Sequence, residues 1–498
     1  GASSGMAMAH WEIQGWMILI LGWVFVPFYT RSMVYTMPEF LERRYNPQSR
    51  TILSVISLVS YVLTKVAVTV YAGGLVFQQV FGIKELWGID FFWIAAIGLV
   101  VLTALYTIFG GMKSVLYTSV LQTPILLLGS LIILVLGFKE LGGWDEMMRV
   151  CGAVTVNDYG DTMTNLIRSN DDANFPWLGA LIGSAIIGFW YWCTDQFIVQ
   201  RVLSGKNEME ARRGTIFGAY LKLLPVFLFL IPGMIAFALH QKYIGAGGEG
   251  FLPMLANGTA NADAAFPTLV AKLLPAGVKG LVVCGILAAL MSSLASLFNS
   301  SAMLFTIDFY KRFKPETPEK KLVGIGQIAT IVIVVLGILW IPIMRSVGDV
   351  LYTYLQDVQS VLAPGIAAAF LLGICWKRTS AQGGMWGLIS GMVIGLTRLG
   401  AKVYYSNAGE VADSTFKYLF YDMNWLFFCG WMFLFCIIVV IVVSLATEAP
   451  TAEKIQGLVF GTATKEQKAA TRASWNHWDI IHTVIILAIT AAFYWYFW

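Results

Sequence analysis

Charged residues are scarce in this chain of 498 residues: Asp, Glu, Lys and Arg together make up 12% of it. Soluble domains have about a quarter of their residues charged. Hydrophobic residues reach 58%, and a single soluble core, which stops growing at about 250–300 residues, cannot bury that much apolar surface. The composition excludes a soluble enzyme, a nucleic-acid-binding protein and a disordered scaffold. It predicts a polytopic membrane protein whose surroundings are the lipid bilayer.

Histidine and cysteine are also few, at 4 and 6 residues. The histidines show no metal-ligand spacing with carboxylates, and no pairing of a nucleophile with a base is visible. The scattered cysteines predict neither a zinc site nor a disulfide framework. We therefore do not expect an enzyme, and nothing in the sequence indicates an obligate protein partner.

Apolar runs of about 20 residues predict an all-α membrane bundle of about twelve spans. Their approximate limits are 4–28, 51–82, 91–109, 115–138, 177–199, 214–240, 278–309, 323–344, 350–375, 384–401, 418–446 and 478–498. The runs lack the alternating polarity of barrel strands. Because the longest loops are too short for an independent module, residues 1–498 are predicted to form a single transmembrane domain.

Lysine and arginine are concentrated in the loops that follow the first, third, fifth, seventh, ninth and eleventh predicted spans. Basic loops face the cytoplasm in membrane proteins. Both chain ends and the long loops 139–176 and 241–277 are thus predicted to lie outside. We expect a multi-pass protein of the plasma membrane, which in a bacterium is the inner membrane.

Four ionisable residues fall within predicted spans: Glu12, Lys65, Asp195 and Lys222. Such groups are costly at membrane depth and mark functional sites or internal pairs, unless they reach the headgroups from a helix end. Asp195 is predicted mainly to be the partner in an internal ion pair. For Lys65, pairing and ligand binding are equally open. Glu12 lies among small residues beside Trp11, which suits a carboxylate that binds hydroxyl groups.

The fifth predicted span combines glycines with aromatic residues. Gly179, Gly183 and Gly188 precede the aromatic run 189–192. Glycine weakens a helix, so the pattern predicts a discontinuous helix with backbone exposed to a central cavity. The alternative, an aromatic belt at the membrane interface, fits poorly because the cluster lies in the middle of the span.

Hydroxyl and amide residues mark the seventh and ninth predicted spans. Ser292 and Ser293 either join helices or, with a carbonyl three residues earlier, supply half of the oxygen shell of a small hard cation. In the ninth span, Gln356 and Gln359 are one helical turn apart and precede Pro364, which is a natural kink.

These features resemble the sodium:solute symporter family, and within it the sodium/glucose cotransporter branch. The resemblance covers residues 1–398, while 399–498, with the flanking C-terminal helices, matches only in hydropathy. The motifs that carry the resemblance are at 36–40, 110–111, 190–196, 199–201, 220–222, 291–308, 370–373 and 376–378.

The resemblance implies two inverted five-helix repeats of the LeuT type around a central cavity. It places sugar contacts on Glu12, Lys222 and Gln356, with Tyr191 as an inner gate beneath the sugar and Trp192 beside it. It also implies that sodium is co-transported and binds at the Ala289 carbonyl and at the hydroxyls of Ser292 and Ser293, with its remaining ligands on a helix that this sequence lacks.

The chain departs from the family pattern in three places. Two N-terminal helices of the family, including the first helix of the core, are absent before Gly1, so we expect an N-terminally incomplete sequence that does not transport as written. Ser119 stands where the family usually has Asp near the sodium exit. Gly188 stands where relatives carry Asn or Thr in contact with the sugar, and its loss is expected to widen the pocket or change its preference.

The predicted function is sodium-coupled uptake of a hexose such as glucose or galactose by alternating access. Two alternatives stay open. One is a symporter of myo-inositol or another polyol, and the other is a sugar-gated sensor or leak channel that has the pocket without coupled transport.

Overall fold

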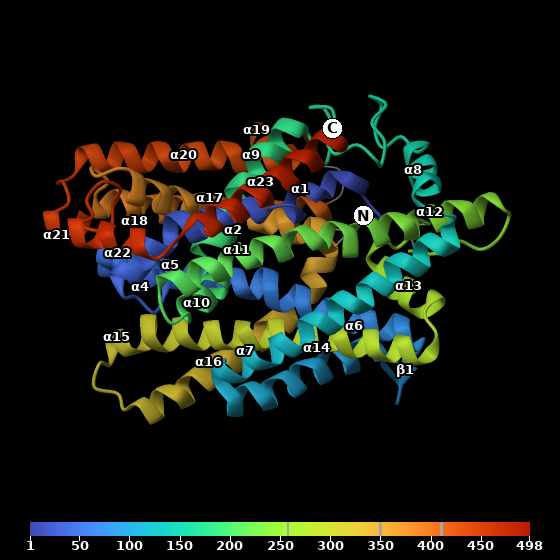
Figure 1. Cartoon of the computed structure of the whole chain (residues 1–498), viewed down its shortest axis with the longest axis horizontal. Helices are drawn as coiled ribbons and strands as arrows, with labels where there is room; N and C mark the ends of the chain where they lie inside the picture. Colours follow the sequence, from blue (N-terminus) through green and yellow to red (C-terminus); the bar gives the residue numbers. More distant parts are fainter. Residues whose placement is uncertain (256–257, 348–350, 409–411) are drawn as a thin grey trace.

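The computed structural model describes residues 1–255, 258–347, 351–408 and 412–498, except for the side chains of 106, 108–116, 118, 121, 344–347 and 353. Nearly all regular structure in the described part is helical, as predicted. The one sheet is a small hairpin of β1 (Glu85–Leu86) and antiparallel β2 (Ile89–Asp90). Long helices lie side by side along the longest axis of the molecule (Figure 1).

The first seven of the predicted spans correspond to runs of helical segments, several of them interrupted. Their bounds are η1 (Gly5–Met8), α1 (Ala9–Glu12), α2 (Gly15–Ile20), η2 (Leu21–Phe25) and α3 (Val26–Ser32); α5 (Pro47–Ser60), η3 (Tyr61–Val66) and α6 (Ala67–Phe81); α7 (Phe91–Leu141); α9 (Trp177–Gly188), η4 (Phe189–Thr194) and α10 (Gln196–Leu203); α11 (Glu208–Pro225), η5 (Val226–Leu230) and α12 (Ile231–Gly245); and α14 (Ala276–Met303), η7 (Leu304–Tyr310) and α15 (Lys311–Phe313).

The remaining long helices are α16 (Glu319–Val347), α17 (Leu351–Cys375), α18 (Ala381–Asn407), α20 (Trp425–Ala446) and α23 (His477–Tyr496). Short elements connect the spans: α4 (Met37–Arg44), α8 (Trp144–Gly152), η6 (Ala262–Ala264), α13 (Ala265–Leu273), α19 (Thr415–Lys417), η8 (Tyr418–Asp422), α21 (Ala452–Ile455) and α22 (Lys465–Ala473).

Within the described residues, 10 helices are long and apolar enough to cross a membrane. The predicted span 384–401 lies in α18, a helix that is not among them because its glycines and the charged Arg398 and Lys402 make it less apolar. The predicted spans 91–109 and 115–138 both lie in α7, which is assigned as one helix. The motif at 110–111 falls in a stretch of α7 whose side chains are outside the described part of the structure.

The connecting elements are sorted between the two ends of the bundle. Helices α4, α10, α15, α21 and α22, which carry the basic loops, lie toward the left of Figure 1, whereas α8, the hairpin and both chain termini lie toward its right. This arrangement agrees with the predicted sidedness, in which the two chain ends are on the same side.

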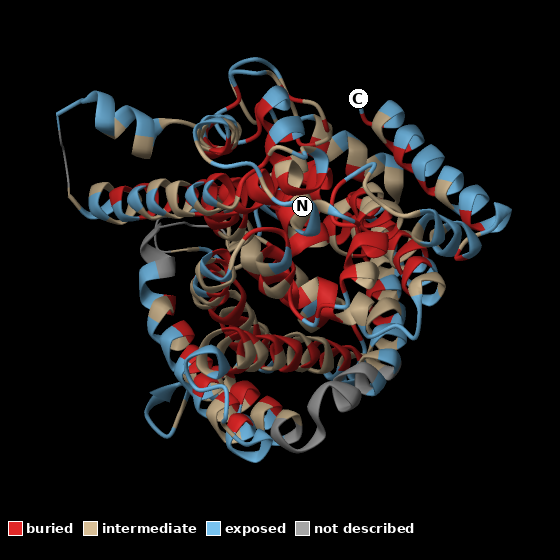
Figure 2. Ribbon diagram, turned by 90° about the vertical axis from the view of Figure 1, so that its left-hand side faces the viewer, coloured by how far each residue is buried: buried red, intermediate tan, exposed pale blue. Residues whose placement is uncertain are grey.

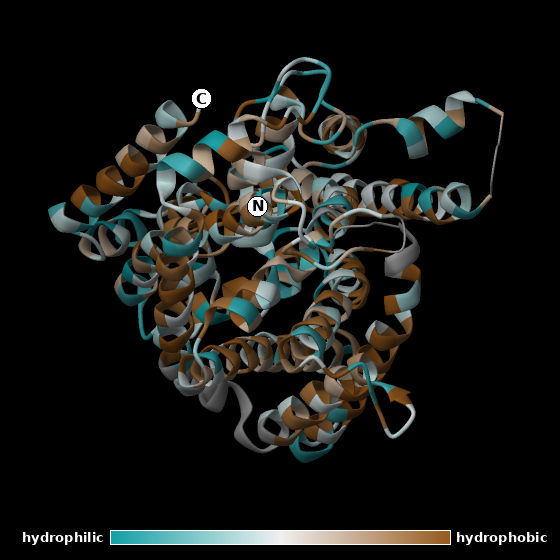
Figure 3. Cartoon of the chain, turned by 90° about the vertical axis from the view of Figure 1, so that its right-hand side faces the viewer, coloured by the Kyte–Doolittle hydropathy of each residue, from teal (hydrophilic) through white to brown (hydrophobic). Residues whose placement is uncertain are grey.

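Apolar side chains occur both inside and outside the bundle. Figure 2 shows buried residues concentrated in the centre, and Figure 3 shows hydrophobic residues on the outer helices as well. On α16, for example, Ile328 and Leu339 are each 64% exposed, and on α20 Trp431 is 62% exposed. Apolar outer faces of this extent are expected where lipid is the surrounding medium.

Two features of the bundle define its interior. Helix α2 packs on α11 and α23, while α17, α18 and α20 pack against one another and α14 packs along α7. In the described part of the chain, six π-helical segments lie in or beside the spans, namely η2, η3, η4, η5, η7 and η8. Because π-helical turns disturb regular hydrogen bonding and are frequent at functional sites, the places where these helices meet are candidates for a site.

Candidate functional site

The first span is interrupted beside Glu12. Helix α1 ends at this residue, Ile13 and Gln14 leave helical geometry with ψ values of 20° and 29°, and α2 begins at Gly15. A Cβ added to Gly15 would lie 2.9 Å from the Ala219 carbonyl oxygen, so glycine here permits α2 to approach α11 closely. The break turns the side chains of Glu12 and Gln14 toward the interior of the bundle, as in other transporter helices that line a binding cavity.

Three helices bring together a carboxylate, an ammonium and a phenol. The Lys222 ammonium on α11 donates to Glu12 Oε2 at 2.8 Å. The Tyr352 hydroxyl on α17 donates to Glu12 Oε1 at 2.6 Å. The side chains of Lys222 and Glu12 retain 16% and 19% exposure, so the ion pair is accessible from a cavity rather than sealed in the core.

A cavity of about 200 Å³ surrounds this ion pair. All five residues predicted to contact the substrate line it: Glu12, Tyr191, Trp192, Lys222 and Gln356. The seven other lining residues are Trp11, Gln14, Ile187, Gly188, Tyr352, Leu355 and Gln359. Two polar atoms of its wall, Trp11 Nε1 and Gln356 Oε1, are buried and have no hydrogen-bond partner within the described part of the chain. Unpartnered buried polar atoms are costly and are expected where a ligand completes them.

The aromatic side of the cavity comes from the interrupted fifth span. Helix α9 ends at Gly188, the π-helical η4 carries Tyr191 and Trp192, and Asp195 is extended with ψ 126° before α10 begins. The predicted discontinuous helix is therefore confirmed. The rings of Tyr191 and Trp192 are 5.1 Å apart at 82°, and the Lys222 ammonium lies 5.6 Å from the centre of the Trp192 ring.

A second ion pair lies near Tyr191. Lys65 of η3 donates to Asp195 Oδ2, and the other oxygen of Asp195 accepts from the Tyr61 hydroxyl at 2.9 Å and from the Phe197 amide at 3.1 Å. The Lys65 ammonium also lies 4.9 Å from the centre of the Tyr191 ring. The predicted ion-pair role of Asp195 is confirmed, and for Lys65 the structure shows the pairing alternative.

The residues predicted to bind sodium lie on one stretch of α14. Ala289, Ser292 and Ser293 are all on this helix, and the Ser292 hydroxyl is 2.6 Å from the Ser119 hydroxyl of α7. None of these three lines the cavity around Glu12. No group of three or more His, Cys, Asp or Glu side chains that could hold a metal occurs in the described part of the chain. A sodium role for the three residues stays a prediction.

Sequence reasoning missed Tyr352 and Gln14. Tyr352 precedes the predicted Gln356 by four residues on α17, so helical periodicity alone places both side chains on one face. Gln14 is two residues beyond Glu12, where regular helical geometry would turn it away from the carboxylate. Only the break at Ile13 and Gln14 allows both side chains to face the same cavity.

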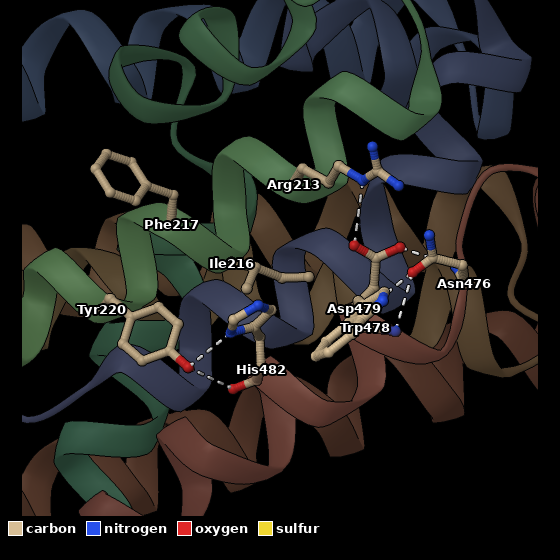
Figure 4. A pocket seen from close by; sticks show the side chains of 8 residues that line it. All are labelled: Arg213, Ile216, Phe217, Tyr220, Asn476, Trp478, Asp479 and His482. Atoms are coloured by element: carbon tan, nitrogen blue, oxygen red, sulfur yellow. Dashed lines mark hydrogen bonds and ion pairs between the residues drawn. The ribbon is translucent and has the colours of Figure 1, made fainter.

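Another pocket, of about 350 Å³, lies between α11 and α23 (Figure 4). There Arg213 Nε donates to Asp479 Oδ1 at 3.2 Å, and the Tyr220 hydroxyl is 3.1 Å from His482 Nδ1. This pocket is lined by Phe217 and Trp478, which are 65% and 57% exposed. It contains none of the predicted site residues.

The model of the sodium:solute symporter family matches residues 1–391. The sodium/myo-inositol cotransporter 2 of Homo sapiens is 35% identical over 475 residues, which cover 93% of this chain and 69% of that protein. A sodium/mannose cotransporter of Bos taurus is 35% identical over 504 residues, covering 97% of this chain and 83% of that protein. The sodium/glucose cotransporter 4 of Danio rerio is 35% identical over 470 residues, covering 91% and 70%.

Among solved structures, a Na⁺-coupled sialic acid symporter in an outward-open state superposes with a TM-score of 0.67. The alignment covers 90% of this chain and 85% of that chain at 21% sequence identity, which establishes a shared fold. The architecture is thus the LeuT-type transporter fold, as the sequence predicted. The chain belongs to the sodium:solute symporter family and is a multi-pass membrane transporter that couples solute movement to sodium.

Proposed function

We propose that this protein takes up a neutral hexose of the glucose or galactose type, driven by the inward sodium gradient. The observation that carries the proposal is the Glu12–Lys222 ion pair inside a cavity of about 200 Å³. The pair has no net charge, so the cavity favours a neutral solute. A substrate carboxylate bound to Lys222 would be repelled by the Glu12 carboxylate beside it.

The cavity wall offers the hydrogen bonds that a sugar needs. An ammonium has three donors and an ionised carboxylate has about four acceptor positions, whereas Glu12 and Lys222 use only part of this capacity on each other and on Tyr352. Trp11 Nε1 and Gln356 Oε1 add a buried donor and a buried acceptor. Ring hydroxyls, which both donate and accept, satisfy all these groups at once.

The aromatic residues complement the other surface of a pyranose, its apolar C–H face. Tyr191 and Trp192 supply two rings on one side of the cavity. Small-molecule sites combine such apolar walls with a few placed polar groups. At about 200 Å³ the cavity is below the roughly 300–1,000 Å³ that is common for larger ligands, which suits a single monosaccharide.

We further propose that Tyr191 is the inner gate and that sodium binds at the Ala289 carbonyl and the Ser292 and Ser293 hydroxyls. Small hard cations take oxygen ligands of this kind. Sodium binding and sugar binding then favour the same conformation, which links their affinities reciprocally. Alternating access in the plasma membrane, the inner membrane in a bacterium, converts this linkage into uptake.

A cyclic polyol such as myo-inositol is the second candidate substrate. It is supported by the 35% identity to a sodium/myo-inositol cotransporter, which equals the identity to a sodium/glucose cotransporter. The polar groups around Glu12 suit hydroxyls of either class.

The test is uptake of labelled glucose, galactose and myo-inositol by the full-length protein in proteoliposomes. We expect accumulation that needs an inward sodium gradient, and a loss of affinity of about tenfold or more in Gln356→Ala. The matched control is Gln78→Ala on α6, whose amide bonds to the exposed Asp90 far from the cavity. Equal uptake with a potassium or proton gradient contradicts sodium coupling, and sugar-evoked current without accumulation indicates a sensor or channel.

A further inference from the structure

The amide of Gln14 occupies the space that a side chain at position 188 would need. Both residues line the cavity around Glu12. A Cβ added to Gly188 would lie 2.7 Å from Gln14 Oε1 and 3.0 Å from the amide carbon. Contacts this short force the amide to move, because real Cβ atoms essentially never approach so closely. Glycine at position 188 and the observed placement of Gln14 therefore depend on each other.

The orientation of the Gln14 amide is fixed by its neighbour on α9. Gln14 Nε2 donates to the Ser184 carbonyl oxygen at 2.9 Å, and Gln14 is only 2% exposed. In the reversed orientation, Oε1 would face the Ser184 carbonyl oxygen, and the two acceptors would repel each other. The hydrogen bond therefore determines the positions of Oε1 and Nε2. The amide oxygen is consequently the amide atom nearest to position 188, at 2.7 Å from an added Cβ, compared with 3.1 Å for Nε2.

We propose that Gln14 is a substrate-contacting residue that determines specificity, and that Gly188 is the positioning residue which makes room for it. Gln14 Oε1 accepts a hydrogen bond from a ring hydroxyl of the substrate. The inference rests on the proposed transport of a neutral sugar or polyol and deepens it. Gln14 lies in the break between α1 and α2, and this break allows its side chain to face the cavity.

The acceptor character of Gln14 has a consequence for substrate choice. Nε2 donates one of its two N–H groups to Ser184, and Oε1 is the amide atom nearest to position 188, so a substrate group that binds Oε1 must be a donor. A hydroxyl does so, whereas a pyranose ring oxygen or a deoxygenated carbon does not. Sites that bond a substrate hydroxyl discriminate strongly against analogues that lack it, because the buried acceptor is then left unpaired. We therefore infer that a hydroxyl group of the substrate ring lies against Gln14 in the cavity.

The test measures equilibrium binding of labelled glucose, mannose and myo-inositol to the purified full-length protein in sodium. Gln14→Met keeps the side-chain volume and removes the acceptor, and we expect it to weaken binding of the preferred ligand about tenfold or more. Gly188→Ala should weaken it similarly by displacing the amide. Gln14→Ala is also measured alone, and the double variant Gln14→Ala/Gly188→Ala should bind no more weakly than the weaker of Gln14→Ala and Gly188→Ala, because both changes remove the same contact.

Two controls separate this contact from effects on folding. Gly183→Ala lies on the same helix but faces Leu426 of α20 outside the cavity, and it should leave affinity unchanged. Thermal unfolding of each variant reports on the fold. Unchanged affinity in Gln14→Met, or losses that add fully in the double variant, would overturn the inference. If the wild-type protein binds none of the three ligands, it is the proposed function that fails.

Discussion

Two ion pairs lie near Tyr191, and their surroundings differ. At the cavity, Glu12 and Lys222 keep 19% and 16% of their side chains exposed. In the other pair, Lys65 and Asp195 keep 9% and 2%. Both pairs join distant helices, and both place a Lys near aromatic rings. Charge and membrane depth alone therefore do not distinguish a binding site from an internal support.

The difference is spare hydrogen-bonding capacity. Asp195 accepts from Lys65, the Tyr61 hydroxyl and the Phe197 amide in a dry environment, and the rings of Tyr61 and Phe197 lie 4.8 and 4.3 Å from the Lys65 ammonium. The Glu12–Lys222 pair opens onto a cavity, where a solute can replace water. We infer that the Lys65–Asp195 pair, whose oxygens are all used, stabilises the broken fifth span. The proposed function assigns substrate recognition to the Glu12–Lys222 pair, which has hydrogen-bonding capacity to spare.

The largest effect is expected from breaking the Lys65–Asp195 pair. Asp195→Ala leaves the Lys65 ammonium buried and unpaired, which costs about 3–5 kcal/mol of folding stability. Thermal unfolding of the purified protein should show a strongly lowered midpoint. The double variant Lys65→Met/Asp195→Ala should recover most of the loss, since no buried charge is left. Arg149→Gln, which removes an external pair whose Arg is 69% exposed, is the control with little effect. A midpoint for Asp195→Ala equal to that of the control would show that the pair does not support the fold.

The Glu12–Lys222 pair should respond in the opposite way. Glu12→Gln retains an acceptor for Tyr352 but removes the charge opposite Lys222, and we expect substrate affinity to fall by a factor of about 10–100, the equivalent of one or two charge-assisted hydrogen bonds. Stability should change by less than about 1 kcal/mol, because the remaining ammonium faces cavity water. Binding and thermal unfolding are measured on the same preparations. A variant that unfolds as early as Asp195→Ala, with unaltered affinity in its folded fraction, would reverse the assignment of the two pairs.

The ionisable residues of both pairs and the interrupted fifth span could be predicted from the sequence, whereas the partners of these residues could not. Scarce charges within apolar runs identified Glu12, Lys65, Asp195 and Lys222, and glycines before aromatic residues predicted the interrupted fifth span. The hydrogen-bond partners of these residues could not be predicted from the sequence, because tertiary packing brings them together: Tyr352 is 340 residues from Glu12 along the chain. Gln14 faces the cavity only because α1 ends two residues before it.

The smallest effect tests a carboxylate that has no Lys or Arg partner among the described side chains. Asp263 of η6, outside the membrane spans, accepts from the Leu351 amide with both oxygens, at 3.2 and 3.0 Å, at the start of α17. Burial raises the pKa of Asp263 to about 6, against the opposing Leu351 hydrogen bond. An unfolded Asp titrates near about 3.9, so between about pH 4 and 6 the folded protein binds more protons, and its stability falls as the pH rises through this window.

Asp263→Asn keeps an acceptor for Leu351 without the buried charge. Its stability should therefore exceed that of the wild type by up to about 3 kcal/mol above pH 6, with the advantage vanishing near pH 4. Thermal unfolding from pH 4 to 7.5 measures this, with Asp263→Ala, which loses the hydrogen bonds to Leu351, as the destabilised control. Parallel pH profiles for wild type and Asp263→Asn would mean that the carboxylate is well solvated in the folded protein, and that an external acid behaves unlike either buried pair.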